Sequence, residues 1–289
     1  MKEQLQGAIE SVHNSLFRLC RILSHESNKG QQFRRLVASV GWQVWKRTVA
    51  RPIMITLFNG YRFLAYPGCD SSSNAICFSI ADYREVTFLR KRIRGGVLID
   101  VGANVGLFAL SMADKIDRAF LFEPNILAAQ RAQANMVRNH LDYEVHAVAL
   151  SDEAGDLFLE DRGGVDSTNR TLTDPQLTSF PTRKVRRTTL DSFIKEHVDF
   201  PKNIALVKID VEGHENAVLR GMQRTLATLC PQILMFEYLQ RTDFCETEKL
   251  LNTAGYTIHS LNREGSLTPV VGKPQALQNL FALHGSENQ

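Results

Sequence analysis

The sequence predicts an α/β fold: a doubly wound, mostly parallel sheet preceded by an N-terminal helical extension and a short β-hairpin. Three observations support this prediction. Short apolar runs alternate with helical patterns over about residues 96–261, and such alternation is typical of parallel sheets. A glycine-rich segment follows the first of these runs and opens a helix. The chain has 289 residues, of which 44% are hydrophobic and 22% charged, so it can bury a substantial core.

Residues 1–52 are expected to form a basic helical extension, with the main domain at 53–289. Apolar residues recur there at spacings of three and four, and a break at 27–30 separates two helical stretches. The second stretch carries Phe33, Leu36, Val37, Trp42 and Trp45. Ten of the 34 basic residues but only three of the 31 acidic residues precede residue 67. The extension is therefore interpreted as a packed cap, with a membrane-surface helix or a self-association surface as alternatives.

The next segments are short. Ile53 to Tyr66 is predicted to form two strands around Asn59-Gly60, a dipeptide common in hairpins. Residues 67–74 are rich in turn-forming residues and are expected to be a loop. A helix is predicted over residues 82–92, ending before Gly95-Gly96.

The alternating region then supplies the main sheet. Strands are predicted at residues 97–100, 120–122, 145–150, 204–209, 233–236, 256–260 and 279–283. Helices are predicted at residues 105–115, 126–140, 214–229 and 246–253. The polar segment 163–181 is the longest insertion in this pattern.

The segment from Asp100 to Gly106 is the strongest local signal. Its glycines allow a sharp turn and a close approach to a ligand, and the following helix offers free backbone N–H groups. Glu123 ends the second strand, where its carboxylate can accept hydrogen bonds from two ribose hydroxyls. Asn104 stands where the NAD fingerprint has its second glycine, and Asp100 suits the ammonium group of a methionine moiety. The alternatives are a purely structural turn, an NAD(P)-dependent oxidoreductase and a non-catalytic nucleoside-binding module.

A second cluster follows the fourth strand. Lys208 and Asp210 lie on one face of that strand, and other ionisable residues follow at the same edge of the sheet. These residues are Glu212, His214 and Glu215, with Glu237 ending the next strand. Glu215 is also well placed to stabilise a helix N-terminus. No metal is expected, although Asp210, Glu212 and Glu215 together could hold a hard divalent cation.

From about Gly96 to Tyr238 the sequence resembles the FkbM family of methyltransferases, over roughly half of the chain. The resemblance rests on five blocks in order: residues 99–106, 122–125, 149–152, 189–191 and 208–215. It implies the Rossmann-like class I methyltransferase fold and S-adenosylmethionine as the cofactor. It also implies hydroxyl groups as acceptors, frequently on sugars or polyketide-like metabolites.

The same resemblance assigns expected roles. Residues of the glycine-rich segment would hold the methionine part of the cofactor, Glu123 its ribose, and Ser151 or Asp152 would lie by the adenine. The expected cofactor-binding set is Asp100, Gly102, Ala103, Asn104, Gly106, Glu123, Pro124, Ser151 and Asp152. Asp210 and Glu212 would face the acceptor. The expected catalytic set is Asp210, Glu212 and His214, with Asp210 or His214 as the base and Glu212 orienting the acceptor.

The expected reaction is an in-line displacement in which an acceptor oxygen attacks a sulfonium methyl group. The expected partner is a hydroxylated small molecule, a glycan or a lipid-linked glycan. Residues 67–289 carry 24 basic and 28 acidic residues, which disfavours a nucleic acid partner. Residues 163–181 and the basic cluster after them form a candidate acceptor lid, or equally a solvated loop beside a charged edge strand.

The cytoplasm is the expected location, with peripheral membrane contact as the variant. No window approaches the roughly 18 uncharged apolar residues of a membrane span, and no basic segment at the N-terminus leads into an apolar run. The five cysteines are scattered and form no CxxC pair, which favours reduced thiols over a zinc or redox site.

Overall fold

The computed structural model describes residues 19–160, 171–172, 176, 178–240, 242–274 and 278–285. The chain forms two compact units, Met1–Tyr83 and Arg84–Gln289. The first unit therefore extends beyond residue 52, where the sequence divided the chain. Most of the polar segment 163–181, and the apolar positions before residue 19, lie outside the described residues.

The first unit combines helices with a two-stranded sheet. Residues 19–24 are helical, and the 3₁₀ helix η1 (Glu26–Asn28) separates them from α2 (Gln32–Thr48). Strands β1 (Ile53–Thr56) and β2 (Arg62–Ala65) pair antiparallel, with Ile53 opposite Ala65. The expected helix break and hairpin are confirmed.

The expected loop at residues 67–74 is wrong, because α3 occupies Asp70–Cys77. Serine is a poor helix former in isolation, but tertiary contacts use two of these hydroxyls. The Ser72 hydroxyl accepts from the Tyr66 backbone N–H at 2.9 Å, and the Trp42 indole N–H donates to Ser73 Oγ at 3.1 Å. Packing of α3 against its own unit thus outweighs its turn-like composition.

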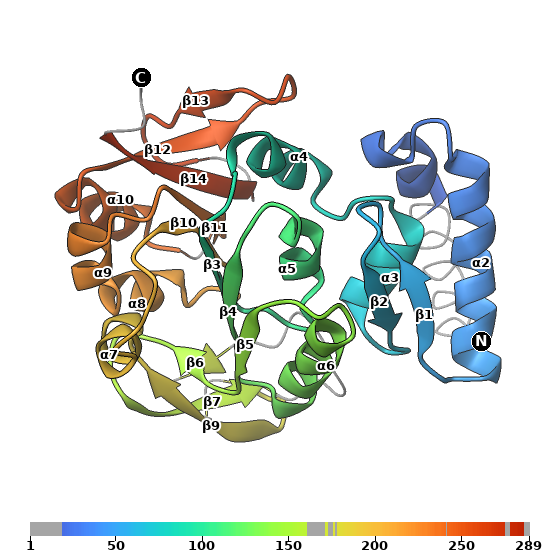
Figure 1. Cartoon of the computed structure of the whole chain (residues 1–289), viewed down its shortest axis with the longest axis horizontal. Helices are drawn as coiled ribbons and strands as arrows, with labels where there is room; N and C mark the ends of the chain where they lie inside the picture. The colour runs from blue at the N-terminus through green and yellow to red at the C-terminus, as the bar shows by residue number, and fades with distance from the viewer. Residues whose placement is uncertain are drawn as a thin grey trace. The chain divides into compact units, whose positions relative to one another are not determined.

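The second unit is built on an eight-stranded sheet in the order β13-β12-β14-β11-β10-β3-β4-β5 (Figure 1). Its parallel centre comprises β11 (Ile233–Tyr238), β10 (Ile204–Ile209), β3 (Val97–Val101), β4 (Arg118–Phe122) and β5 (Tyr143–His146). The remaining strands β14 (Gln278–His284), β12 (Tyr256–Leu261) and β13 (Leu267–Pro269) join by antiparallel pairing. Every residue of β3 and β10 is buried, as in a sheet covered on both faces. The predicted doubly wound α/β fold is confirmed.

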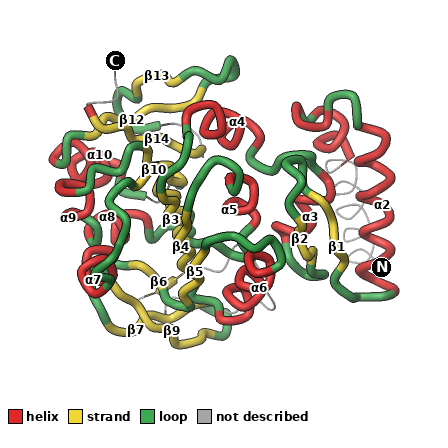
Figure 2. Tube along the Cα trace, viewed as in Figure 1, coloured by secondary structure: helices red, strands yellow, loops and turns green. Residues whose placement is uncertain are grey.

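Helices flank this sheet (Figure 2). They are α4 (Tyr83–Arg92), α5 (Leu107–Met112), α6 (Ile126–Val137), α7 (Leu190–Glu196), α8 (Glu215–Arg220), α9 (Gln223–Thr228) and α10 (Phe244–Thr253). The single helix predicted over residues 214–229 is wrong, since α8 and α9 are separate. Gly221 lies between the two helices and close to the segment that contains Ser151. A Cβ at Gly221 would be 1.9 Å from the Ser151 carbonyl oxygen.

A second, four-stranded sheet was not predicted. It contains β6 (Ala149–Leu150), β9 (Thr182–Thr188), β7 (Gly155–Glu160) and β8 (Thr171–Leu172), in that order. The single strand predicted over residues 145–150 is wrong, because β5 belongs to the main sheet and β6 to this one. Residues 145–150 contain one polar residue, His146, at which β5 ends, but no Gly or Pro marks the change from one sheet to the other. Among the described residues, no helix is long and apolar enough to span a membrane.

Candidate active site

The turn between β3 and α5 requires glycine at two positions. Gly102 has φ +78°, and a Cβ there would lie 1.8 Å from the backbone oxygen of Asp210. Gly106 has φ +79°, and its Cβ would lie 2.6 Å from Met136 Cε. Gly102 thus allows the loop after β3 to touch the loop after β10, which brings the two sequence clusters to one place.

Glu123 at the end of β4 is fastened to this turn by backbone groups. Its Oε2 accepts from the Asn104 N–H at 2.9 Å, and its Oε1 accepts from the Asn125 N–H at 2.8 Å. Burial raises the pKa of Glu123 to about 7. Because a carboxylate oxygen can accept two hydrogen bonds, each still has capacity for a ligand hydroxyl.

Asp100, the fourth residue of β3, is fully buried. Neither of its carboxylate oxygens accepts a hydrogen bond from any residue in the described part of the chain. Burial raises the pKa of Asp100, although Lys208 Nζ lies 3.4 Å from Oδ1 and opposes the rise. Oδ1 thus forms an ion pair with Lys208, whereas the buried Oδ2 has no partner among the described residues and can accept from a cationic ligand group such as an ammonium.

Lys208 connects this pocket to the second cluster. Its Nζ lies 3.1 Å from Asp210 Oδ2 and donates to the Gly102 carbonyl oxygen at 3.5 Å. The ammonium also lies over the Phe108 ring, 5.4 Å from its centroid. The sequence placed Lys208 on the face of Asp210 without assigning it a role, although a lysine inside an apolar buried strand is itself a signal.

Three carboxylates gather at the ends of β10 and β11. One oxygen each from Asp210, Glu212 and Glu237 lie within 4.8 Å of one another. The Asp210 side chain is 44% exposed. Burial, followed by repulsion from Asp210 and Glu212, raises the pKa of Glu237 to about 8. Glu237 was noted in the sequence but was not placed in the expected site.

Glu215, the first residue of α8, has a different position. It is fully buried, and its Oε1 accepts from the backbone N–H groups of Gly213 at 3.0 Å and Val211 at 3.4 Å. Glu212 lies in this turn with φ +55°, an unfavourable backbone conformation for a non-glycine residue. Glu215 therefore stabilises the turn that carries Asp210 and Glu212. The third carboxylate beside Asp210 and Glu212 is that of Glu237, and not that of Glu215 as the sequence suggested.

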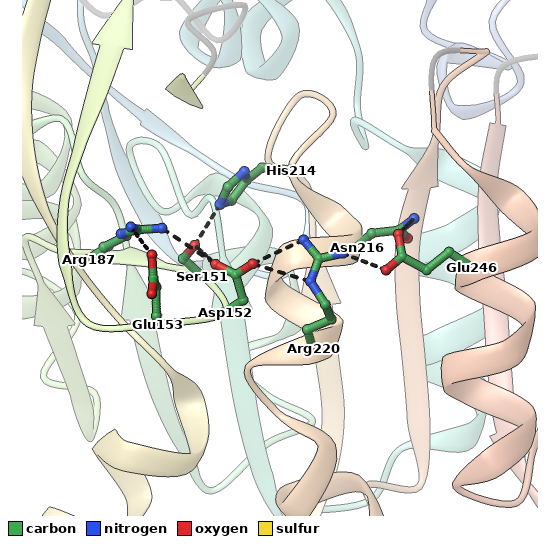
Figure 3. Close-up of polar contacts among 8 residues, drawn as sticks. All are labelled: Ser151, Asp152, Glu153, Arg187, His214, Asn216, Arg220 and Glu246. Atoms are coloured by element: carbon green, nitrogen blue, oxygen red, sulfur yellow. Dashed lines mark hydrogen bonds and ion pairs between the residues drawn. The ribbon is translucent and has the colours of Figure 1, made fainter. Parts of the chain in front are cut away.

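His214 belongs to a separate polar network, drawn in Figure 3. Its Nε2 lies 2.9 Å from Ser151 Oγ, which donates to Asp152 Oδ1 at 3.0 Å. Burial lowers the pKa of His214 to about 4. His214 is therefore neutral at physiological pH, with one ring nitrogen engaged.

Arginines complete this network (Figure 3). Arg220 donates to Asp152 Oδ2 at 3.2 and 3.0 Å and to Glu246 Oε1 at 2.6 Å. Arg187 pairs with Asp152 at 3.5 Å and also with Glu153. Asp152 thus ties β9 to α8, and the cluster of basic residues on β9 supplies one of its partners.

The expected residues therefore fall into three groups. The first group comprises Asp100 inside β3 and the residues of the two loops that follow β3 and β4, namely Gly102, Ala103, Asn104, Gly106, Glu123 and Pro124. Asp210 and Glu212 lie in the loop after β10, which touches the first group through Gly102. His214, Ser151 and Asp152 form the third group.

Known proteins resemble this chain over the region that contains these residues. The model of the family described as "Methyltransferase FkbM domain" matches residues 100–258. Hexuronic acid methyltransferase AglP of Haloferax volcanii is 30% identical over 182 residues, which are 62% of this chain and 71% of the relative. Methyltransferase 1 of Beauveria bassiana is 26% identical over 203 residues, which are 63% of this chain and 77% of the relative.

Solved structures are more distant. The tRNA (uracil-54, C5)-methyltransferase of Pyrococcus abyssi, in complex with S-adenosyl-L-homocysteine, aligns with a TM-score of 0.44 and 16% identity. The alignment covers 80% of this chain and 44% of that one. A likeness of this degree carries no information about the acceptor of the present chain.

Proposed function

Because the chain belongs to the FkbM family of S-adenosylmethionine-dependent methyltransferases, we propose that it methylates a hydroxyl oxygen of a sugar, glycan, glycolipid or related metabolite. S-adenosylmethionine is the cofactor, and when bound it supplies an electrophilic methyl group. The reaction proposed is an in-line displacement at that carbon. Membership in this family also removes the grounds for the oxidoreductase alternative.

One observation carries the proposal: Lys208 lies between a buried acid and a half-exposed one. Its Nζ is 3.4 Å from Asp100 Oδ1 and 3.1 Å from Asp210 Oδ2. Asp100 lies in β3, just before the turn proposed to hold the cofactor, whereas the Asp210 side chain is 44% exposed and can contact an acceptor. An acceptor hydroxyl that contacts Asp210 would therefore lie beside the donor pocket, as a displacement reaction requires.

The donor pocket fits the chemistry of S-adenosylmethionine. Asp100 Oδ2, which has no partner among the described residues, is suited to the ammonium of the methionine part. The remaining acceptor capacity of Glu123 is suited to the two ribose hydroxyls. Gly102 lets this turn approach the backbone of Asp210, so the proposed methionine site and the proposed acceptor site are adjacent.

Asp210 is our proposed general base, and Glu212 is proposed to orient the acceptor. An alcohol is a weak nucleophile, so its proton must be removed as the new bond forms. His214 is the weaker candidate because its Nε2 is engaged by Ser151. Its lowered pKa of about 4 also removes the advantage that a histidine ordinarily has over a carboxylate as a base. His214 is instead proposed to hold the loop after β6 against the start of α8.

A carbohydrate acceptor is supported by the relative from Haloferax volcanii, whose name is hexuronic acid methyltransferase. Hydroxyl groups of sugars are hydrogen-bond donors, and the three neighbouring carboxylates Asp210, Glu212 and Glu237 offer acceptors for them.

The test has two stages. Calorimetric titration of the full chain with S-adenosylmethionine and S-adenosylhomocysteine is expected to show saturable binding, weakened at least tenfold by Asp100→Ala and by Glu123→Ala. Asp199→Ala, a change of an exposed aspartate after α7, is the matched control and should bind normally.

In the second stage, methyl-labelled cofactor is offered with hexuronic acid-containing oligosaccharides, neutral oligosaccharides, RNA and DNA. Label is expected in an alkali-stable methyl ether of a saccharide. Label in RNA or DNA alone, or in a nitrogen-linked methyl group, would overturn the proposed acceptor class. Absence of cofactor binding by folded protein would overturn the assigned pocket.

A further inference from the structure

Helix α2 exposes a continuous apolar stripe. Phe33 is 78% exposed, Val40 57%, and Val37 and Val44 55% each. Their spacings of four, three and four residues place all four within an arc of about 60° at 100° per residue. Four large apolar side chains in one row differ from the single exposed apolar residues that are normal on protein surfaces.

The stripe is not the side by which α2 joins its own unit. That role belongs to the opposite face, where Trp42 is buried and donates to Ser73 of α3 at 3.1 Å. Ser39 on the same side accepts from the Cys77 thiol at 3.3 Å. A surface helix ordinarily has polar residues opposite its packed face, so a second apolar face calls for a partner.

The charges around the stripe indicate what that partner is. Helix α2 contains no Asp or Glu, and the exposed Arg34 and Arg47 flank the stripe on its two edges. A second copy of α2 would bring more arginines and no carboxylate to meet them. An anionic lipid surface satisfies both features, because it buries the apolar side chains and attracts the cations.

We propose that α2 lies in the plane of an anionic bilayer surface, with Phe33, Val37, Val40 and Val44 inserted among the lipids. At 1.5 Å per residue the 17-residue helix is about 25 Å long, enough to lie flat with all four side chains in contact. Arg34 and Arg47 contact phosphate groups on either side. This proposal does not depend on the proposed acceptor of the methyl group.

The experiment is cosedimentation of the full chain with vesicles of phosphatidylcholine alone or with one-third phosphatidylglycerol. The wild-type chain is expected to partition at least tenfold more strongly onto the anionic vesicles, and added salt should weaken this binding. Val37→Ser/Val40→Ser and Arg34→Gln/Arg47→Gln should each lower the partition coefficient at least tenfold. Val198→Ser/Val271→Ser changes two valines that are 94% and 95% exposed in the other unit and should leave binding unchanged.

Three results would overturn the proposal. The first is binding that is absent, or equal for wild type and Val37→Ser/Val40→Ser. The second is a wild-type dimer in sedimentation equilibrium that this double variant converts to a monomer, which would assign the stripe to a second copy. The third is a melting temperature lowered by several degrees relative to Val198→Ser/Val271→Ser, which would show that the chain itself covers the stripe. Valine and serine have similar helix propensities, so the helix alone would not cause such a shift.

Discussion

The proposed donor and acceptor halves of the candidate active site are built in different ways. On the donor side, Asp100 is fully buried and Glu123 is 9% exposed, and backbone N–H groups hold both oxygens of Glu123. On the acceptor side, Asp210 is 44% exposed and lies among other carboxylates. The donor side is therefore defined by backbone geometry, and the acceptor side by the charges of side chains.

This difference matches the two ligands. The cofactor is the same in every reaction, so a rigid backbone turn can bind it. At Gly102 this turn has no room for a larger residue. An acceptor is met by side chains that can be exchanged without disturbing the sheet. The donor half should therefore respond to substitution with loss of structure as well as binding, and the acceptor half with loss of turnover alone.

Gly102→Ala is expected to have the largest effect. The new Cβ would meet the Asp210 carbonyl oxygen at 1.8 Å, and alanine would be forced into a left-handed conformation. We expect a loss of roughly 3 kcal/mol or more in stability and at least a hundredfold loss in affinity for S-adenosylmethionine. Chemical denaturation and calorimetry measure the two effects.

Gly265→Ala is the control for backbone strain. Gly265 has φ +80°, but a Cβ there would have no neighbour within 4 Å. It should cost only about 1–2 kcal/mol and leave cofactor affinity unchanged. Equal losses from both variants would mean that the contact between the loops after β3 and β10 is not what makes Gly102 necessary.

Asp210→Asn should reduce turnover about 10²–10⁴-fold, the range of a lost general base, with cofactor affinity within threefold of wild type. His214→Gln keeps a hydrogen-bonding side chain beside Ser151 and should reduce turnover less than fivefold. Single-turnover methyl transfer at saturating cofactor gives both values. The reverse order of effects would make His214 the base and Asp210 a residue that positions the acceptor.

The pH dependence of stability provides a further test of the proposed donor half. The pKa of Glu123 is about 7 in the folded protein against an ordinary 4.5, so between these values the folded state holds a proton that the unfolded state has lost. This group therefore lowers stability as pH rises from about 4.5 to 7, by about 3 kcal/mol in total. Glu123→Gln should remove this component from stability measured across pH 4–8.

Cofactor affinity should change in the opposite direction. Ionised Glu123 is the better acceptor for ribose hydroxyls, so wild-type affinity should rise several-fold between pH 6 and 8. The affinity of Glu123→Gln should be weaker and flat over this range. A wild-type affinity that is independent of pH would place the ribose elsewhere.

The smallest expected effect is that of metal removal. The Lys208 ammonium, 3.1 Å from Asp210, supplies a positive charge beside the acidic cluster. Excess EDTA is therefore expected to leave the rate of methyl transfer unchanged. A rate abolished by EDTA and restored by Mg²⁺ would instead assign Asp210, Glu212 and Glu237 to a divalent cation.

The sequence was most informative where a local pattern carries its own physical cause. Alternating strands and helices predicted the parallel sheet, and Asn59-Gly60 predicted the hairpin. The predictions from sequence failed where contacts between residues distant in sequence determine the local structure. Ser73 of α3 accepts from the Trp42 indole, 31 residues away, and residues 145–150 divide between two sheets.

The candidate site follows the same rule. The residue types and their order along the chain identified both clusters, because carboxyl ends of parallel strands meet at one edge of a sheet. Only the tertiary structure decided how the clusters meet: through the missing side chain of Gly102 and through the ammonium of Lys208. The tertiary structure also assigned His214 to the network of Ser151 rather than to the carboxylates Asp210, Glu212 and Glu237. The sequence could not show this, because burial and hydrogen bonding depend on residues that are far apart in sequence.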